Sequence, residues 1–574
     1  MKLNSSIVLS EGSRRRRLPT ALARKMPEVY NPAMRIGIAQ INSRVGAIQQ
    51  NVEEILSRIA EAKQAACNLV IFPELALCGY TPFDLLWRSG FAEKVAGALQ
   101  EIARASQGIG VIVGGLSSQP AREGENLTDP SSIIDGAGCK LFNTAFLIAD
   151  GRLMGAEEKL HLPTFDVYHE KRYFTAGAGA KVFDFLGMRL GISICEDLWV
   201  EDGPADVQAS LGAELLINIS ASPFFAGKAA IRRRLCSQRA TASGVTLVCV
   251  NRVGGQDELV FDGGSFIVGP NGDLLCQAPH FEEGLFVADL GCVAPVSLPH
   301  ENPIQLIHQA IVLGIRDYVR NNGFSRVIVG LSGGIDSAIV AVLASEALGP
   351  EAVTGVFLPS EITSEESRQD AVEAASRLSI ELLEIPLAEV LSSAQCALPE
   401  AATGLAAENL QARIRGCVLM TLANQSDALV LATGNKSEIS MGYNTLYGDT
   451  VGALAPIADL FKTDVYCLAE VLGDRIPQRV REKAPTAELR PGQRDEDDLP
   501  PYAVLDPILR KLIEQNSSRE QLIAQGFPEA VVDDVLTRYY RSEYKRRQLP
   551  PGIKVSPKAF GIGRRMPITH GYRG

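Results

Sequence analysis

The chain has 574 residues, of which 46% are hydrophobic and 21% are charged, and its formal net charge is −11. This composition is typical of a globular protein with an ample core, and the negative charge argues against a protein that binds nucleic acid through a broad basic face. Eleven cysteines are scattered without a C-x-x-C pair, which disfavours a zinc site or a redox pair and favours a reducing, cytoplasmic location.

The N-terminal segment does not have the pattern of a secretory signal, because its apolar stretch is short and Arg14–Arg17 follow it instead of preceding it. We expect residues 1–33 to form a disordered extension and the folded part to begin near Met34. No uninterrupted apolar run reaches the ~18 residues that a membrane-spanning helix needs, so no membrane span is expected.

Short apolar segments alternate with longer amphipathic segments through the first half of the chain. Residues 34–41 predict a strand and residues 51–66 predict a helix, because their apolar side chains recur with the periods of those structures. Further strands are predicted at 69–74, 110–115, 189–195, 214–220 and 245–251. Strands interleaved with helices indicate a layered α/β domain.

A break follows this series in L-P-H-E-N-P, where two prolines and polar residues predict a linker over residues 298–305. After it we expect a helix at 304–321, a strand at 325–331 and a second α/β series. The pattern therefore predicts two α/β domains, over residues 34–297 and 306–574.

Three short segments of the first half contain candidate catalytic residues. F-P-E-L-A-L-C-G-Y places Glu74 at a strand end, K-L-H-L-P-T-F places Lys159 before a long loop, and G-I-S-I-C-E-D-L-W ends a strand at Cys195. The acids Glu196 and Asp197 disfavour a Cys195 thiolate by like-charge repulsion. Taken singly, these residues also fit a surface acid, a solvated lysine and a core thiol.

Together the three segments resemble the nitrilase superfamily, which implies an α-β-β-α sandwich with Glu74, Lys159 and Cys195 as its catalytic triad. In such a triad the lysine ammonium stabilises the thiolate and the oxyanion, and we expect it to outweigh the adjacent acids. The glutamate takes the thiol proton and later activates water. A Cys-His dyad using His161 or His169 is the alternative, but Cys-His amidotransferases have different local sequences.

The segment N-I-S-A-S-P-F-F-A-G-K, residues 218–228, resembles the pocket of glutamine-using members of that superfamily. The resemblance implies that Phe165, Ser222 and Lys228 bind the amino-acid end of glutamine. Phe165 stands where those members carry a tyrosine, so a hydrogen bond from its side chain is not expected.

A glycine-rich loop, G-L-S-G-G-I-D-S-A at residues 330–338, lies between a predicted strand and an apolar helix. Its glycines let backbone N–H groups approach an anion at the helix N-terminus, and Ser332 and Ser337 add hydroxyl donors. Asp336 is a candidate Mg²⁺ ligand. The loop is not a Walker loop, which needs a lysine, and the plain alternative is a glycine-rich turn. S-G-G-x-D-S resembles the N-type ATP pyrophosphatases, which adenylate a carbonyl oxygen and release pyrophosphate.

The runs E-N-L-Q-A-R-I-R-G, L-A-T-G-N-K-S-E, P-I-A-D-L-F-K-T and K-A-P-T-A-E-L-R-P-G-Q follow in an order that resembles NAD synthetases. This resemblance implies a Rossmann-like, parallel-sheet ATP pyrophosphatase domain. It assigns to ATP the residues Gly330, Ser332, Gly333, Gly334, Asp336, Ser337, Thr433, Lys462 and Thr486. It assigns to Mg²⁺ Asp336 and Glu438, and to deamido-NAD Asn409, Arg413, Glu438 and Lys545.

Two stretches of the second half are less informative. For the acidic run Asp495–Asp498 we expect a solvated loop and not a metal site, because Pro500 and Pro501 follow it directly. The segments around Ile362 and around residues 448–451 depart from the NAD synthetase pattern, and no ligand contact is assigned to them.

The two resemblances together imply a glutamine-dependent NAD synthetase, whose partners are the small molecules deamido-NAD, ATP and L-glutamine. Cys195 forms a thioester with glutamine and releases ammonia, which displaces AMP from adenylated deamido-NAD. The family also implies a homo-oligomer and an internal passage for ammonia. The alternatives are a nitrilase fused to another N-type synthetase, making GMP or asparagine, and a first domain that serves only for docking while free ammonia is used.

Overall fold

The computed structural model describes residues 34–120, 139–292, 294–297 and 301–572. The extension expected at residues 1–33 lies outside the described residues, as do residues 298–300 of the expected linker. Within the described ranges, every helix is too short or too polar to cross a lipid bilayer.

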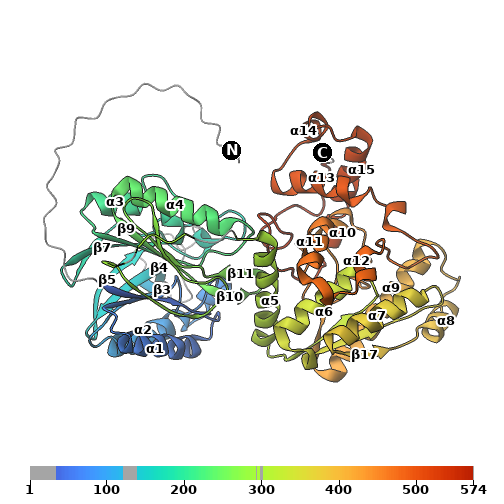
Figure 1. The fold of residues 1–574 in the computed structure, drawn as a ribbon, viewed down its shortest axis with the longest axis horizontal. Helices are drawn as coiled ribbons and strands as arrows, with labels where there is room; N and C mark the ends of the chain where they lie inside the picture. Colours follow the sequence, from blue (N-terminus) through green and yellow to red (C-terminus); the bar gives the residue numbers. More distant parts are fainter. Residues whose placement is uncertain (1–33, 121–138, 293, 298–300, 573–574) are drawn as a thin grey trace.

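The first half of the chain is built on two six-stranded sheets that pack face to face (Figure 1). The first sheet has the order β14-β1-β2-β3-β4-β5, with the bounds Gly284–Asp289, Arg35–Gln40, Leu69–Ile71, Gly110–Pro120, Cys139–Ala149 and Arg152–Glu158. The second has the order β13-β12-β9-β8-β7-β6, with the bounds Leu274–Gln277, Phe266–Val268, Thr246–Asn251, Leu215–Ser220, Met188–Ile194 and Val182–Phe185.

Helices cover the outer face of each sheet, which gives four layers. Helices α1 (Ile48–Gln64) and α2 (Phe91–Ala105) lie on the first sheet, and α3 (Pro204–Ser210) and α4 (Lys228–Ser243) lie on the second (Figure 1). Because side chains alternate along a strand, Leu69 and Ile71 pack between the sheets whereas Val70 and Phe72 pack under the helices. The predicted α-β-β-α sandwich is confirmed.

The second half contains a four-stranded parallel sheet in the order β17-β16-β15-β18. These strands are Glu381–Glu384, Val353–Phe357, Arg326–Gly330 and Ala428–Leu431. One face packs against α5 (Pro303–Asn321), α6 (Ile335–Leu348), α7 (Glu365–Leu378) and α11 (Lys462–Leu472). The other face packs against α8 (Ala388–Cys396) and α9 (Leu405–Ser426), so the predicted Rossmann-like layering is confirmed.

The remaining α-helices of the described residues lie between residues 436 and 546. Their bounds are α10 Lys436–Met441, α12 Gln478–Glu482, α13 Tyr502–Glu514, α14 Arg519–Ala524, α15 Glu529–Arg541 and α16 Glu543–Arg546. Helices α13, α14 and α15 form a small core of their own, which also holds Met441 and Phe461 (Figure 1).

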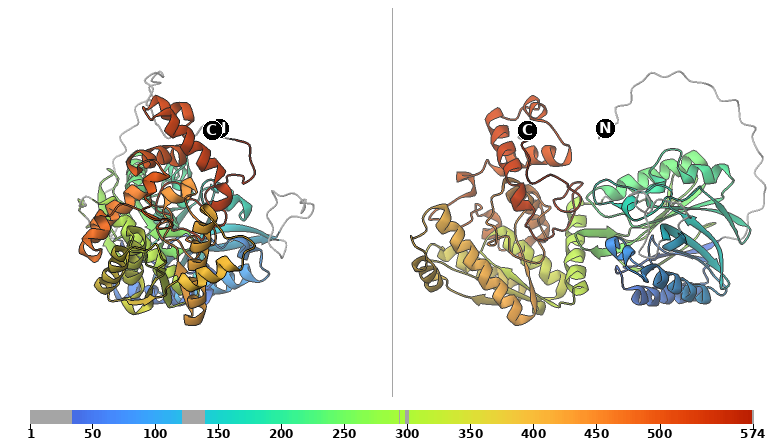
Figure 2. Two further views of the ribbon diagram at one scale, coloured as in Figure 1. Left: turned by 90° about the vertical axis from the view of Figure 1, so that its right-hand side faces the viewer. Right: turned by 180° about the vertical axis from the view of Figure 1, so that it is seen from behind.

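The two halves meet across α5 and the hairpin of β10 (Val253–Gln256) and β11 (Leu259–Asp262), which lie side by side in Figures 1 and 2. Phe224, Val253 and Val260 of the first half share one hydrophobic core with Ile311 of α5 and Ile553 near the C-terminus. The junction is therefore an apolar core and not a solvated linker surface.

Candidate active sites

Glu74 and Lys159 each follow a strand of the first sheet, and their side chains meet beyond the strand ends. Glu74 follows β2 and Lys159 follows β5, and the Lys159 ammonium donates to Glu74 Oε1 over 2.7 Å. Asn143 also donates to Glu74 Oε1 (2.7 Å), and the Ala221 backbone N–H donates to Oε2 (2.8 Å). The Glu74 and Lys159 side chains have no exposed area, so three donors fix the carboxylate in place.

Cys195 begins the 3₁₀ turn Cys195–Leu198 directly after β7 and is only 3% exposed. Burial and the Glu74 carboxylate raise the pKa of the Cys195 thiol well above its usual value. Lys159 lowers that pKa by more than the adjacent Glu196 raises it, but burial and Glu74 still leave the pKa raised. The resting thiol is therefore protonated, and a base must take its proton at the moment of attack.

A second carboxylate, Glu170, was missed by the sequence analysis. It lies in the 3₁₀ turn Glu170–Arg172, and its Oε1 accepts hydrogen bonds from Lys159 (2.7 Å) and from the Tyr80 hydroxyl (2.8 Å). Burial raises the pKa of Glu170 to about 7 although the Lys159 charge lowers it. Burial also acts to lower the pKa of Lys159, but Glu170 and Glu74 together hold it well above its usual value. Lys159 therefore stays charged.

The acid Asp197, which follows Cys195 closely, has a structural role. Its carboxylate accepts from the backbone N–H groups of Ile194 (3.2 Å) and Leu160 (3.1 Å), and it contacts His161 Nδ1 at 3.1 Å. Asp197 thus joins the Cys195 turn to the segment after Lys159. His161 is engaged by Asp197 and His169 contacts Arg565, an arrangement that does not support a Cys-His dyad.

The three residues expected to bind glutamine lie around this cluster. Lys228, at the start of α4, donates to Pro223 O (2.9 Å) and lies 3.4 Å from the Tyr168 hydroxyl. Burial lowers the pKa of Lys228 to about 8. The Phe165 ring packs edge-on against Tyr168 with 5.4 Å between centroids and is 53% exposed, whereas Ser222 is buried. Phe165 has no hydroxyl, but the neighbouring Tyr168 places one beside Lys228. The sequence pattern did not identify Tyr168.

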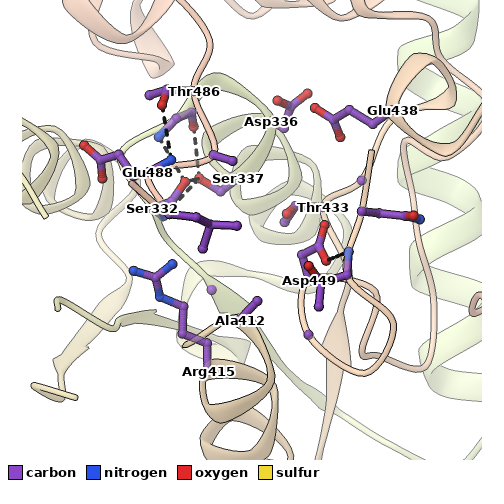
Figure 3. Close-up of a pocket in the computed structure, with 18 of the residues that line it drawn as sticks. Ser332, Asp336, Ser337, Ala412, Arg415, Thr433, Glu438, Asp449, Thr486 and Glu488 are labelled. Carbon is purple, nitrogen blue, oxygen red and sulfur yellow. Dashed lines mark hydrogen bonds between the residues drawn. The ribbon is translucent and has the colours of Figure 1, made fainter. Parts of the chain in front are cut away.

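The glycine-rich loop joins β15 to α6 in the second half. The Ser332 and Ser337 hydroxyls lie 3.2 Å apart, and the Gly334 N–H donates to Ser332 Oγ at 3.2 Å (Figure 3). Gly333 has φ +78°, and a Cβ built there would lie 2.3 Å from Ser367 O, so the loop requires glycine at this position. The N-terminus of α6 thereby faces open space with backbone donors exposed to a ligand.

Two carboxylates converge beside this loop. Asp336 and Glu438 point toward one another (Figure 3), and the Lys462 ammonium contacts Asp336 and lies 3.7 Å from Glu438 Oε1. Burial and the Asp336 charge raise the pKa of Glu438 to about 8, and both acids raise the pKa of Lys462 against the effect of burial. One lysine thus faces two acids, and a hard cation bound between the two carboxyl groups would favour their ionised forms.

A cavity of about 560 Å³ brings most of the predicted residues of the second half together. The predicted residues that line it are Gly330, Ser332, Gly334, Asp336, Ser337, Asn409, Thr433, Glu438, Lys462, Thr486 and Lys545. Gly333 and Arg413 lie outside this lining. Gly333 supports the loop backbone, and Arg413 Nε donates to Leu446 O (3.2 Å) at the solvent-exposed surface of α9.

The expectation of a solvated loop at Asp495–Asp498 is wrong for Asp495. This residue is 3% exposed, accepts from the Tyr502 hydroxyl (2.8 Å) and lines the cavity together with Asp498. Two further residues that line the cavity, Arg415 and Asp449, have no role assigned from the sequence. The Arg415 side chain extends from α9 in the direction of Ser332 (Figure 3). Burial raises the pKa of Asp449 to about 6.

Comparison with known proteins gives matches over both halves. The sequence matches the carbon-nitrogen hydrolase family over residues 35–292 and the NAD synthase family over residues 307–550. A glutamine-dependent NAD(+) synthetase of Synechocystis sp. is 41% identical, and one of Thermotoga maritima is 38% identical; each alignment covers 94% of this chain and 99% of the relative. The solved structure of a glutamine-dependent NAD+ synthetase from Acinetobacter baumannii, in complex with ADP, is 35% identical with a TM-score of 0.73, covering 93% of this chain and 98% of that one.

Proposed function

The chain belongs to the family of glutamine-dependent NAD(+) synthetases, and we propose that the two sites described above divide its reaction between them. The enzyme is an ATP-dependent ligase that converts deamido-NAD, ATP, L-glutamine and water into NAD, AMP, diphosphate and L-glutamate. The observation that carries the assignment is the presence, in one chain, of a buried Glu-Lys-Cys cluster and of a glycine-loop cavity with a lysine between two acids.

In the first site Cys195 Sγ attacks the side-chain amide carbon of glutamine while Glu74 takes the thiol proton. Lys159 donates to the developing oxyanion, and the C–N bond breaks as the proton passes to the leaving ammonia. Water then attacks the thioester, again with Glu74 as the base, and releases glutamate. The raised pKa of Cys195 supports this order, because the thiolate forms only when substrate and base are in place.

In the second site the carboxylate of deamido-NAD attacks the α-phosphorus of ATP and diphosphate leaves. The glycine loop and the N-terminus of α6 bind the phosphates, with Ser332, Ser337, Thr433, Lys462 and Thr486 as donors. Ammonia from the first site then attacks the adenylated carbonyl carbon, and AMP leaves with formation of the amide. We assign Asn409, Arg413, Glu438 and Lys545 to deamido-NAD.

We infer that Mg²⁺ is the cofactor of this reaction and that Asp336 and Glu438 would hold it. The donor set fits, since two carboxyl groups, the ligand type that this hard cation prefers, converge there. Among the residues that the structure describes, no group of three or more His, Cys, Asp or Glu side chains is placed to hold a metal. When bound, the ion supplies positive charge against the phosphates.

The domain bounds, the oligomeric state and the cellular location are also part of the proposal. We place the glutaminase domain at residues 34–297 and the synthetase domain at 306–574, and we propose a cytoplasmic homo-oligomer. Of the linker predicted at 298–305, the last three residues already form the start of α5. The scattered cysteines and the use of ATP support the location.

The experiment compares glutamine with ammonium as nitrogen donor, in wild type and Cys195→Ala, with deamido-NAD and ATP. We expect the substitution to abolish glutamine-driven NAD formation and to leave ammonium-driven formation within about twofold. Cys292→Ala, at an exposed position outside the site, is the matched control. Equal rates in wild type and Cys195→Ala with both donors would reject the nucleophile. Xanthylate and aspartate in place of deamido-NAD test the other N-type synthetase reactions.

A further inference from the structure

A segment near the C-terminus, residues 551–565, runs from the synthetase domain to the glutaminase domain; we call it the crossing segment. Its first anchor lies in the synthetase domain. The Asp459 carboxylate accepts from the backbone N–H groups of Val555 (2.8 Å) and Ser556 (2.7 Å). Lys436 of α10, two residues before Glu438, donates to Ser556 Oγ at 2.7 Å. The segment is thus fixed to the synthetase domain beside α10.

The second anchor lies in the glutaminase domain. The Lys554 N–H donates to Glu258 O (2.8 Å), and the Ala226 N–H donates to Val555 O (2.9 Å). The Ile562 N–H donates to Glu258 Oε2 at 3.0 Å. Backbone hydrogen bonds therefore hold the crossing segment beside Ala226, two residues before Lys228.

The side chain of Lys554 is buried, 3% exposed, and carries its charge into this contact. Its Nζ donates to Ser556 O (2.7 Å) and Pro557 O (2.9 Å), and it forms an ion pair of 3.4 Å with Asp166 Oδ2. A buried ammonium is costly without a counter-charge. Asp166, which belongs to the glutaminase domain, supplies that charge to a lysine of the synthetase domain.

Asp166 is a turn residue next to Phe165. It has φ +50°, a conformation that Asp tolerates and bulky residues do not, and the Tyr168 N–H closes the turn on Phe165 O at 3.0 Å. The turn packs the Phe165 ring against Tyr168 and places the Tyr168 hydroxyl 3.4 Å from Lys228 Nζ.

Lys228 and Lys554 also lie over the same aromatic ring. Their Nζ atoms are 5.4 Å and 5.9 Å from the centroid of Phe225. Lys228 contacts the Tyr168 hydroxyl, and Lys554 pairs with Asp166. The position of the Asp166 turn relative to Lys228 therefore depends on where the crossing segment places Lys554.

We propose that Lys554 is a positioning residue of the glutaminase pocket, supplied by the synthetase domain. By pairing with Asp166 it holds the Phe165–Tyr168 turn against Lys228 in the arrangement that receives the amino-acid end of glutamine. The inference rests on the proposed assignment of this pocket to glutamine. The amide chemistry at Cys195 does not depend on it, so the pair sets substrate binding and not the rate of the chemical step.

The test uses Asp166→Asn in the full-length enzyme, because asparagine keeps the size and tolerates the left-handed conformation. We expect the KM for glutamine to rise about tenfold, which is ~1.4 kcal/mol, with kcat and the ammonium-driven rate within about twofold of wild type. Lys554→Met should act in the same way. The double variant should be no worse than the stronger single variant, because both changes remove one interaction.

Lys558→Met is the matched control, because Lys558 lies 3.8 Å from Asp166 Oδ1 but is one-third exposed, and it should leave the KM for glutamine within about twofold. An unchanged KM in Asp166→Asn overturns the proposal, and so does a parallel fall of the ammonium-driven rate, which indicates a purely structural role. If Lys554→Met does not fold, Lys554→Arg, which retains the charge, should keep a near wild-type KM. Retention of glutamine-driven activity by Cys195→Ala would reject the pocket assignment itself, whatever Asp166→Asn does.

Discussion

The ammonium of Lys159 lies 2.7 Å from the carboxylate of Glu74, and neither side chain has any exposed area. A buried ion pair becomes costly when one partner is lost, by ~3–5 kcal/mol, because the other charge remains in a dry environment. Here Glu170 also accepts from Lys159, so the ammonium keeps a negative partner when Glu74 is neutralised. The chemistry of Glu74 can therefore be removed without leaving Lys159 unpaired.

Glu74→Gln is expected to lower glutamine-driven NAD formation by ~10²–10⁴-fold, because an amide cannot take the Cys195 proton or activate water. The ammonium-driven rate should stay unchanged, and the midpoint of thermal unfolding should move little since Glu170 still compensates Lys159. Glu158→Gln, at a half-buried acid that accepts from Gln119, is the control and should behave as wild type. A fall in the ammonium-driven rate of Glu74→Gln would contradict this separation of roles.

Tyr168→Phe is expected to raise the KM for glutamine about fivefold, since a hydrogen bond of ~1 kcal/mol beside Lys228 is lost. Phe165→Tyr, which restores the hydroxyl of the family pattern, should change the KM by less. Steady-state kinetics on glutamine, with ammonium as the second donor, measures both. The prediction is wrong if Phe165→Tyr has the larger effect.

The lowered pKa of Lys228, about 8, predicts a pH dependence of glutamine binding. Below pH 8 the lysine is protonated and pairs with the substrate carboxylate. As the pH rises through this pKa the charge is lost, so kcat/KM for glutamine should fall by up to ~10-fold per pH unit. Lys228→Arg keeps its charge at these pH values, and its profile should lack that fall. Because glutamine's own amino group titrates equally for both enzymes, identical profiles would reject the assignment.

Lys462→Met is expected to lower NAD formation with either nitrogen donor by ~10²–10³-fold. The change removes the positive charge that lies beside Asp336 and Glu438 and is assigned to the ATP phosphates. Glutamine hydrolysis at Cys195 should remain measurable as glutamate release. Lys511→Met, in α13 and outside the cavity, should leave NAD formation unchanged. If Lys462→Met lost only glutamine-driven synthesis and kept ammonium-driven synthesis, the assignment of Lys462 to the ATP-dependent step would be wrong.

Chelation of divalent cations with EDTA is expected to stop NAD formation with both donors, and added Mg²⁺ should restore it. Asp336→Asn should raise the Mg²⁺ concentration for half-maximal rate by more than about tenfold, because affinity for hard cations depends on the charge of the ligands. Asp498→Asn alters another acid of the cavity and should have a smaller effect. Equal shifts in the two variants would remove the special role of Asp336.

The strands and the reactive residues at their ends could be predicted because each depends on local pattern. Cys195 directly follows β7 and Asp336 lies in the first turn of α6, as the apolar runs around them indicate. Glu170 and Tyr168 could not be found in this way, since their importance comes from contacts with Lys159 and Lys228 across loops. The run at Asp495 was interpreted as solvated because composition does not show that Tyr502 covers it.

The electrostatic state of Cys195 also could not be read from the sequence. Of the two neighbouring acids, Glu196 raises the pKa of Cys195 less than burial and Glu74 do, and the Asp197 carboxylate accepts from backbone N–H groups. The largest opposing effects are burial and Glu74, which is distant along the chain. Electrostatic balance inside a protein is set by distance in space and by desolvation, and neither is available from adjacency alone.

The hydrophobic core at the junction bears on whether the two halves of this protein can be encoded by separate genes. Phe224 and Val260 pack with Ile311 and Ile553, so neither half closes its own apolar surface. A gene split at the linker would produce two polypeptides that each expose part of that core to water. The ammonia-producing half and the ammonia-using half are therefore tied into a single translation product, made in equal amounts by construction.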